Sequence, residues 1–187
     1  MKKKIIKIIK IYSIILFVAC ANKTDFKQKF IEDNFLKIVD TIAYSRGAFI
    51  TLPSDTVRYP ELCLKLSNKI MYNDKVNEIV LAFFEKNYSL KKRFNDVLSK
   101  NENNEILLNS NFPKKIGKFH IFFNEEEKIK SIKYAGRIDI GNLKIYKNKA
   151  ILILSESVGH FGKTYILLLI KEKNDWKVFK RELLWQT

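Results

Sequence analysis

Residues that commonly build metal and catalytic sites are scarce in this sequence. It contains two cysteines and two histidines, and His120 and His160 lie forty positions apart. No segment has the spacing of a zinc site, a phosphate-binding Walker loop or a dinucleotide-binding fingerprint. We therefore expect no metal and no cofactor.

A long hydrophobic run is also missing. Near the N-terminus, the nine uncharged residues 11–19 follow a segment with five lysines and no acid. A bilayer core of roughly 30 Å needs about 20 apolar residues, so this run is short for a membrane span. A basic segment, a short apolar run and small residues before a break are typical of a secretory signal. Isoleucines between the lysines extend the apolar character, which leaves an uncleaved anchor as an alternative.

The apolar run ends in the sequence FVAC, in which small residues directly precede Cys20. Val18, Ala19 and Cys20 resemble the lipobox of bacterial lipoproteins, with Phe17 where leucine is usual. The resemblance implies cleavage between Ala19 and Cys20, and a diacylglycerol and fatty acids such as palmitate on Cys20. Two or more acyl chains give a lasting membrane anchor. The alternative is an ordinary signal peptide or core helix with a chance cysteine.

The lipoprotein interpretation divides the chain into three parts. Residues 1–19 are the signal peptide, residues 20–23 are a lipidated tether, and residues 24–187 form a single domain. The domain is expected outside the cytoplasm, in the bacterial cell envelope. Ala21 stands where some lipoproteins carry the aspartate that retains them in the inner membrane, which favours the outer membrane if the cell has one.

Acidic residues are few relative to basic ones. The formal net charge is +15, and loss of residues 1–19 lowers it to +10. In the cytosol such a charge would indicate a nucleic-acid partner. Outside the cytoplasm it favours anionic lipid headgroups, and an AT-rich genome would also give a lysine-rich composition. We expect membrane lipid as the partner, with an envelope protein or a small apolar ligand as alternatives, and do not expect nucleic acid.

Hydrophobic periodicity divides the domain into a helical half and a stranded half. Apolar residues recur at helical spacing in 26–42, 76–84 and 90–98. From Gly117 onward, short runs rich in Ile, Leu, Tyr, Phe and Val alternate with turn residues. The runs AILIL and YILLLI are apolar on both faces and predict central strands covered on both sides. The sequence predicts an α+β fold, with N-terminal helices packed on a C-terminal antiparallel β-meander.

Local signals predict where these elements begin and end. Asp74 and Ser89 are expected to cap the second and third helices. Lys147-Asn148 and Asn174-Asp175 are expected hairpin turns. Segment 48–66 contains two prolines and an alternation of leucines, and is expected to be a loop with one short element.

The last forty residues contain a strand, a glycine-containing loop, a tyrosine-bearing strand and a hairpin with the sequence Trp-Lys-Val. The residues that carry this pattern are Gly159, Gly162, Tyr165, Lys171, Trp176, Lys177, Val178 and Trp185. The pattern resembles the C-terminus of small uncharacterised secreted bacterial proteins and of nuclear-transport-factor-like, or cystatin-like, cone domains. That superfamily contains both enzymes and binding modules, so the resemblance implies no activity.

The segment SESVGHFG contains the best catalytic candidates. Ser155 or Ser157 could act as a nucleophile with His160 as its base. The segment lacks a Gly-x-Ser-x-Gly elbow, and its glycines and serines suit a loop after a buried strand. We therefore do not expect an enzyme. An envelope hydrolase that uses His160 with Ser155 or Ser157 is the alternative.

Cys63 and His120 have plain structural interpretations. Cys63 lies beside leucines and has no basic partner nearby in the sequence, so it is expected to be a buried, inert thiol. His120 alternates with Phe119 and Ile121, which places it on the opposite face of a strand.

Aromatic residues form 13% of the chain and could line a binding surface. A concave sheet face could hold an apolar ligand or a peptide. The aromatic residues expected there are Tyr134, Tyr146, Phe161, Tyr165, Trp176 and Trp185, and the ligand-facing candidates are Tyr165, Trp176, Trp185 and His160. The predicted function is a membrane-anchored, non-catalytic binding or scaffold domain. An inhibitor or immunity lipoprotein is a further alternative.

Overall fold

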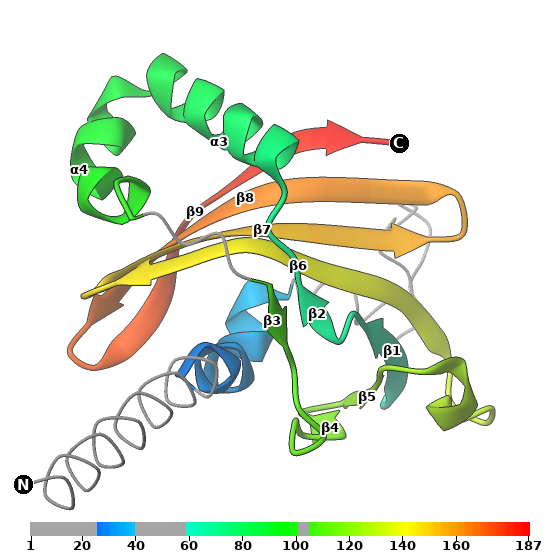
Figure 1. Ribbon diagram of the computed structural model, residues 1–187. Helices are drawn as coiled ribbons and strands as arrows, with labels where there is room; N and C mark the ends of the chain where they lie inside the picture. Colours follow the sequence, from blue (N-terminus) through cyan, green and yellow to red (C-terminus); the bar gives the residue numbers. More distant parts are fainter. Residues whose placement is uncertain (1–25, 40–58, 101–104) are drawn as a thin grey trace, which may run out of the picture.

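The computed structural model describes residues 26–39, 59–100 and 105–187. Within these residues it contains three helices, mostly toward the N-terminus, and a seven-stranded, mostly antiparallel sheet that lies mainly in the C-terminal part (Figure 1). The predicted α+β fold is therefore confirmed.

The C-terminal half forms the predicted antiparallel meander. Its strands are β6 (Tyr134–Tyr146), β7 (Lys149–Val158), β8 (Phe161–Glu172) and β9 (Asp175–Gln186). Each strand has at least ten residues, so the meander makes up most of the sheet. The sequence predicted β6 as separate shorter strands, but a bulge between Gly141 and Lys144 lets it continue.

Two of the three hairpin turns of the meander are as short as predicted, whereas the glycine-containing loop expected after β7 is wrong: Ser155 and Ser157 belong to β7, and only Gly159 and His160 connect it to β8. Lys147 and Asn148 connect β6 to β7 as expected. The next turn consists of Lys173 and Asn174, one residue earlier than predicted, because Asp175 already pairs with Glu172 across the hairpin. Lys173 and Asn174 have φ values of 48° and 69°. Two successive positive φ values are typical of a type I′ turn, whose twist matches the flanking strands.

The other side of the sheet contains the strand that the sequence predicted only as a short element. This strand, β1 (Leu62–Leu66), runs parallel to both β5 (Phe119–Phe122) and β6. The edge is formed by β4 (Lys115–Ile116), so the order is β4-β5-β1-β6-β7-β8-β9. The sequence analysis did not predict the parallel pairing of β1, which a strand from the N-terminal half can make through a long connection.

Two very short strands and one short helix complete the regular structure. The strands β2 (Lys69–Ile70) and β3 (Ile106–Leu107) pair with each other in a separate two-stranded sheet. The 3-10 helix η1 (Glu125–Glu127) lies between β5 and β6, and its three glutamates are exposed.

Three α-helical segments accompany the sheet: residues 26–38, α3 (Asp74–Lys86) and α4 (Tyr88–Leu98). Asn73, rather than the predicted Asp74, caps α3, since its backbone is extended and its side chain accepts a hydrogen bond from the Val76 amide at 3.2 Å.

The start of α4 also differs from its prediction. Asn87 precedes α4 without a side-chain capping bond, and the predicted cap Ser89 lies inside the helix. Only one residue therefore separates the two helices.

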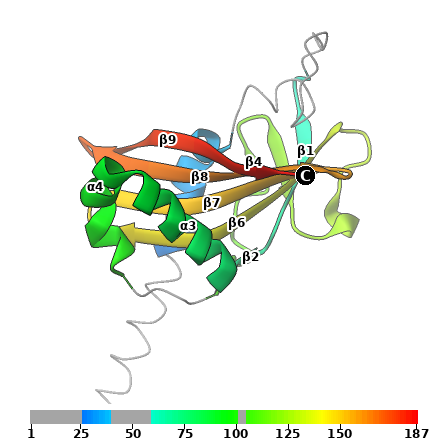
Figure 2. The same ribbon diagram turned by 90° about the horizontal axis from the view of Figure 1, so that it is seen from above.

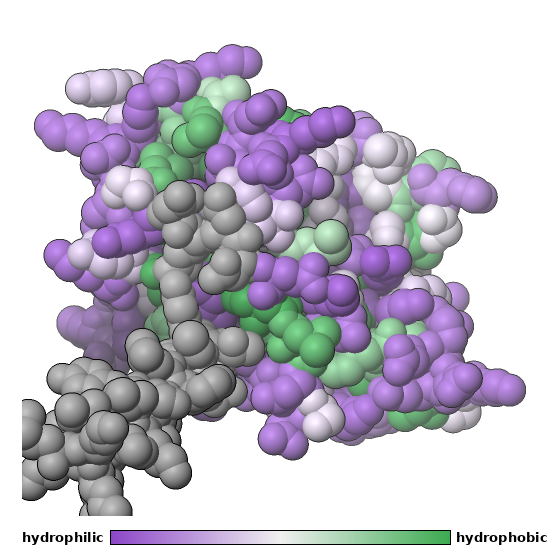
Figure 3. Space-filling view, in the orientation of Figure 1, coloured by the Kyte–Doolittle hydropathy of each residue, from purple (hydrophilic) through white to green (hydrophobic). Residues whose placement is uncertain are grey.

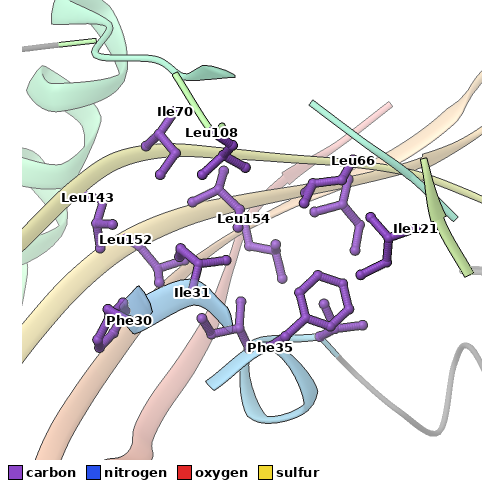
Figure 4. Packing of buried hydrophobic residues seen from close by; sticks show 14 of the residues in the cluster. Phe30, Ile31, Phe35, Leu66, Ile70, Leu108, Ile121, Leu143, Leu152 and Leu154 are labelled. Atoms are coloured by element: carbon purple, nitrogen blue, oxygen red, sulfur yellow. The ribbon is translucent and has the colours of Figure 1, made fainter. Parts of the chain in front are cut away.

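Helices cover both faces of the meander, as Figures 1 and 2 show together. On one face, Phe30, Ile31 and Phe35 of the 26–38 helix pack toward Leu152 and Leu154 of β7 (Figure 4). The prediction that β7 and β8 are covered on both sides is thereby confirmed for the first face.

On the opposite face, Phe84 of α3 and Phe94 of α4 pack in a second cluster with Ile151, Ile153 and Leu168. Consecutive residues of β7 thus enter opposite clusters, which is the period of two expected for a strand buried on both sides. The filled interior leaves surface hollows and the outer part of the sheet as places for a functional site.

Candidate functional site

The residues of the alternative hydrolase do not meet in a nucleophile–base arrangement. Ser155 Oγ lies 2.9 Å from Oγ1 of Thr164 on the neighbouring strand. His160 is exposed in the two-residue turn between β7 and β8. Within the described residues, no hydrogen bond joins His160 to Ser155 or Ser157. A serine nucleophile needs its base within hydrogen-bond reach.

The aromatic candidates are divided between the two faces of the sheet. Tyr165 and Trp176 pack against the cluster beneath the 26–38 helix. Trp185 is the register partner of Thr164. Thr164 lies two residues before Ile166 and so shares its face of the sheet, which belongs to the opposite cluster. Phe161 is 63% exposed at the hairpin end. These residues therefore do not line a single concave surface.

Trp176 instead borders a surface pocket at the start of the domain. This hollow, here called the Trp176 pocket, has a volume of about 220 Å³ and lies between the 26–38 helix and the β8–β9 turn. Phe26, Phe30 and Trp176 form its aromatic wall, and Lys37, Lys171 and Asp175 are among its charged residues. The ring centroids of Phe30 and Trp176 are 5.1 Å apart in an edge-on arrangement, which fixes the indole.

The charged residues of the Trp176 pocket differ in their pairing. Lys37 donates a hydrogen bond to Asp175 and holds the pKa of that carboxyl below its ordinary value. Lys29 pairs with Asp33 at 2.5 Å, whereas Lys171 has no carboxylate partner among the residues that the structure describes, and neither has Lys173 in the adjoining β8–β9 turn. Phe26 is 55% exposed at the same opening. The pocket therefore combines exposed aromatic surface with one lysine, Lys171, whose charge no described carboxylate compensates.

Tyr165 belongs to a different cluster on the same face. The Arg181 guanidinium lies 5.2 Å from the centre of the Tyr165 ring. Arg181 Nη1 is 3.8 Å from Oε1 of Glu156, which is 3% exposed, and Nη2 donates to the Ile38 carbonyl. This cluster joins β7, β8 and β9 to the end of the 26–38 helix, which indicates a structural role for Tyr165.

A cluster that sequence reasoning missed lies on the outer face of β1 and β5. Cys63 and His120 are Cα partners in the parallel pairing of these strands. They line a cavity of about 140 Å³, here called the Cys63 pocket, together with Lys114, Phe122 and Glu127. The predicted orientation of His120, opposite Phe119 and Ile121, agrees with its register. The alternation of each strand predicts which residues face outward, but no local signal predicts that these two strands pair.

Ion pairs surround the Cys63 pocket. His120 Nε2 lies 3.1 Å from Oε2 of Glu61, but it is buried and makes no directed hydrogen bond within the described residues. Lys115 donates a hydrogen bond to Glu61, and Lys115 and His120 together hold the pKa of Glu61 below its ordinary value. Lys114 lies 2.6 Å from Glu127. A thiol and an imidazole thus line this pocket, and the paired side chains of Lys114, Glu127, Lys115 and Glu61 lie around it.

A third hollow lies between α3 and the edge strand β9. It has a volume of about 410 Å³ and is lined by Ile79, Phe83 and Leu183, among others. Hydrophilic side chains cover most of the face seen in Figure 3, and apolar surface occurs between them in smaller patches. Lysines and two register shifts in β9 protect this edge against pairing with another strand.

Ala19 and Cys20 lie outside the described residues, and so does the predicted start of the domain at residue 24. In the described part of the chain, no group of three or more His, Cys, Asp and Glu residues is arranged to hold a metal ion. No helix described by the structure combines the length and apolar character that crossing a bilayer requires. Comparisons with family models, curated proteins and solved structures found no match.

Proposed function

We propose that this chain is a lipoprotein of the bacterial cell envelope whose α+β domain is a non-catalytic binding module at the membrane surface. Acyl chains on Cys20 anchor the domain, as the lipobox-like sequence FVAC indicates. The domain binds anionic lipid headgroups through the Trp176 pocket. The placement of Ser155 and His160 supports a binding role over the hydrolase alternative.

The location of the Trp176 pocket is the observation that carries this proposal. Phe26, in the wall of the pocket, follows Cys20 by six positions in the sequence. A chain of that length spans at most about 20 Å when fully extended. A bilayer that holds Cys20 is consequently close to the start of the 26–38 helix and to the adjacent β8–β9 turn.

The chemistry of the pocket matches a lipid–water interface. Tryptophan is enriched at this interface, because its ring contacts acyl chains while its N–H remains near polar groups. Lys171 in the pocket and Lys173 in the adjoining β8–β9 turn provide positive charge on this side of the domain. Each lysine near an anionic membrane surface contributes about 1 kcal/mol to binding. An anionic phospholipid headgroup satisfies both the aromatic and the charged side of the pocket.

The experiment uses the two tryptophans as separate reporters of membrane contact. The lipidated protein is reconstituted in phosphatidylglycerol vesicles with brominated acyl chains, which quench tryptophan fluorescence on contact. Trp185→Phe leaves Trp176 as the reporter, and Trp176→Phe leaves Trp185. The two residues lie nine positions apart on β9, or about 30 Å along an extended strand.

We expect strong quenching of Trp176 and little quenching of Trp185. Reversal of charge by Lys171→Glu together with Lys173→Glu should weaken the quenching of Trp176. Lys163→Glu, at the far end of β8, is the matched control and should leave it unchanged. Equal quenching of the two tryptophans would contradict the proposed orientation.

A further inference from the structure

Lys100 and Lys147 lie beside the ring of Tyr146, in a group that the Trp176 pocket does not include. The ammonium nitrogen of Lys100 is 4.0 Å from the centre of the Tyr146 ring, and that of Lys147 is 5.3 Å from it. An aromatic ring attracts a cation through its quadrupole but carries no net charge. These three residues, here called the Tyr146 cluster, therefore place two positive charges beside one aromatic side chain.

The Tyr146 cluster lies at the same end of the sheet as the Trp176 pocket. Lys147 belongs to the β6–β7 turn, and the Lys171 amide donates a hydrogen bond of 2.8 Å to the carbonyl of Asn148 in that turn. Lys171 also lines the Trp176 pocket, beside the β8–β9 turn. Three strand spacings of about 4.8 Å, or about 14 Å, separate β6 from β9. Both groups therefore belong to one compact end of the meander (Figure 1).

The Tyr146 cluster and the Trp176 pocket face opposite sides of the sheet. Trp176 packs against the cluster beneath the 26–38 helix, whereas Tyr146 packs against the cluster beneath α3 and α4. A membrane that touched only one face of the sheet would reach only one of them. A membrane that meets the ends of the strands reaches both, because the end of a single sheet exposes side chains of both faces.

The carboxylates beside these turns are already paired with lysines. The pairs are Glu172 with Lys177 at 2.9 Å, Asp96 with Lys149 at 3.0 Å, and Asp175 with Lys37. Other lysines at this end have no carboxylate partner among the residues that the structure describes, namely Lys100, Lys147, Lys171 and Lys173. This end of the sheet therefore carries an excess of positive charge, divided between the two faces.

We propose that the end of the meander formed by the β6–β7 and β8–β9 turns rests on anionic phospholipid headgroups, with the Tyr146 cluster as a second lipid contact. This inference rests on the proposed function and adds the orientation of the domain, in which β6 to β9 run toward the bilayer. Tyrosine, like tryptophan, is enriched at the lipid–water interface. The headgroup phosphates supply the negative charge that pairs with Lys100 and Lys147.

The location of the Tyr146 cluster distinguishes it from a similar pair at the other end of β6. There, Lys128 lies 4.3 Å from the centre of the Tyr134 ring. Tyr134 and Tyr146 are the first and last residues of β6, or roughly 40 Å apart along an extended strand. The tether from Cys20 leads to the wall of the Trp176 pocket, so it holds the Tyr146 end of the strand near the bilayer.

The test compares the reactivity of lysines in the wild-type lipidated chain on phosphatidylglycerol and on phosphatidylcholine vesicles. An uncharged amine-reactive reagent modifies the lysines, and mass spectrometry gives the rate at each position. The same anchor holds the chain on both kinds of vesicle, so a difference in rate reports contact with anionic headgroups.

Three pairs of lysines are compared. The cluster lysines, Lys100 and Lys147, should react about fivefold more slowly on phosphatidylglycerol, which corresponds to about 1 kcal/mol for a lysine at an anionic surface. The turn lysines, Lys171 and Lys173, should be protected in the same way. The control lysines, Lys128 and Lys133, lie at the opposite end of β6 and should react equally on both vesicles.

Charge reversal provides a second measurement. Lys100→Glu together with Lys147→Glu should lower the quenching of Trp176 by brominated phosphatidylglycerol in the Trp185→Phe chain, because loss of one contact lets the domain tilt. Reversal of both control lysines to glutamate makes the same change in net charge and should leave the quenching unchanged. Circular dichroism establishes that each variant is folded, and the wild-type comparison decides the matter even if one is not.

The proposal is overturned if the turn lysines are protected and the cluster lysines are not, and the proposed function then stands with a different orientation. If neither pair is protected, both the proposal and the proposed function are contradicted. Equal protection of the control lysines also overturns the proposal, as does quenching that responds equally to the two charge reversals. Protection confined to the cluster and turn lysines, with the expected loss of quenching, supports it.

Discussion

Arg181 connects the last strand of the sheet to the N-terminal helix. Its guanidinium donates to the Ile38 carbonyl at the end of the 26–38 helix, where the helix itself leaves carbonyls without partners. It also lies over the Tyr165 ring and near the buried carboxylate of Glu156. The Arg181 side chain thus donates a hydrogen bond to a carbonyl at the helix end and places a positive charge near the buried carboxylate of Glu156.

Arg181→Met should lower the free energy of unfolding by about 2–3 kcal/mol, because it removes a charge partner of buried Glu156. Urea unfolding followed by circular dichroism measures this loss. Arg137→Met is the matched control, since Arg137 pairs with Asp139 at 2.7 Å on the exposed face of β6. An exposed pair contributes at most about 1 kcal/mol. Equal losses in the two variants would show that burial of Glu156 does not matter.

Glu61 should give the stability of the protein a component that depends on pH. Its pKa in the folded chain lies below the ordinary value of 4.5. Such a carboxyl stabilises the fold above its unfolded pKa, and this contribution is lost as the pH falls through the folded pKa. Glu61→Gln should therefore be less stable than wild type at neutral pH, and the two should converge well below pH 4.5. Urea midpoints across this range test the prediction, and a constant difference would contradict it.

At the scale of elements, α3 and α4 act as one cover for the second face of the sheet. The rings of Phe84 and Phe94 have centroids 6.3 Å apart and join the two helices above the strands. Neither helix is long enough to be stable alone in water, so their stability depends on this packing.

Phe94→Ala should destabilise the protein by about 3–5 kcal/mol, because Phe94 is fully buried and its removal leaves a cavity. Tyr88→Ala, in the first turn of the same helix, changes a side chain that is 77% exposed and should alter stability by less than about 0.5 kcal/mol. Thermal or urea unfolding of both variants provides the comparison. A small loss for Phe94→Ala would mean that α4 is not part of the cooperative core.

Local pattern predicted some elements well. Runs that are apolar on both faces identified β7 and β8 as central strands, and this holds because each residue of such a run needs a hydrophobic layer on its own side. The turns after β6 and β8 were predicted to within one residue, since their positions depend on neighbouring residues.

Long-range pairing could not be predicted in the same way. Cys63 and His120 are adjacent only because β1 inserts in parallel between β5 and β6. The alternation of each strand contains no information about its partner, so the Cys63 pocket is visible only in the folded chain. The sequence analysis named Trp176 as part of a concave sheet face and did not predict the Trp176 pocket, because the helix that forms its other wall comes from the opposite end of the sequence.

At the scale of the whole molecule, the packed layers leave the surface as the place for a functional site. Helices fill both faces of the meander, and the pockets described here are open hollows at the rim of the fold. With the proposed loss of residues 1–19, the formal net charge would be +10, which would attract the molecule to anionic surfaces. An acyl anchor near the Trp176 pocket would convert this attraction into a fixed orientation on the membrane.

Detergent phase partitioning in a bacterial host supplied with labelled fatty acid tests the membrane anchor most directly. Wild type is compared with Cys20→Ala, and Cys63→Ala serves as the matched cysteine control. The proposed function predicts that wild type and Cys63→Ala take up the label and enter the detergent phase, whereas Cys20→Ala does not take up the label. Unlabelled wild type in the aqueous, cytosolic fraction would contradict the lipoprotein assignment and return nucleic acid to first place as the partner of this basic chain.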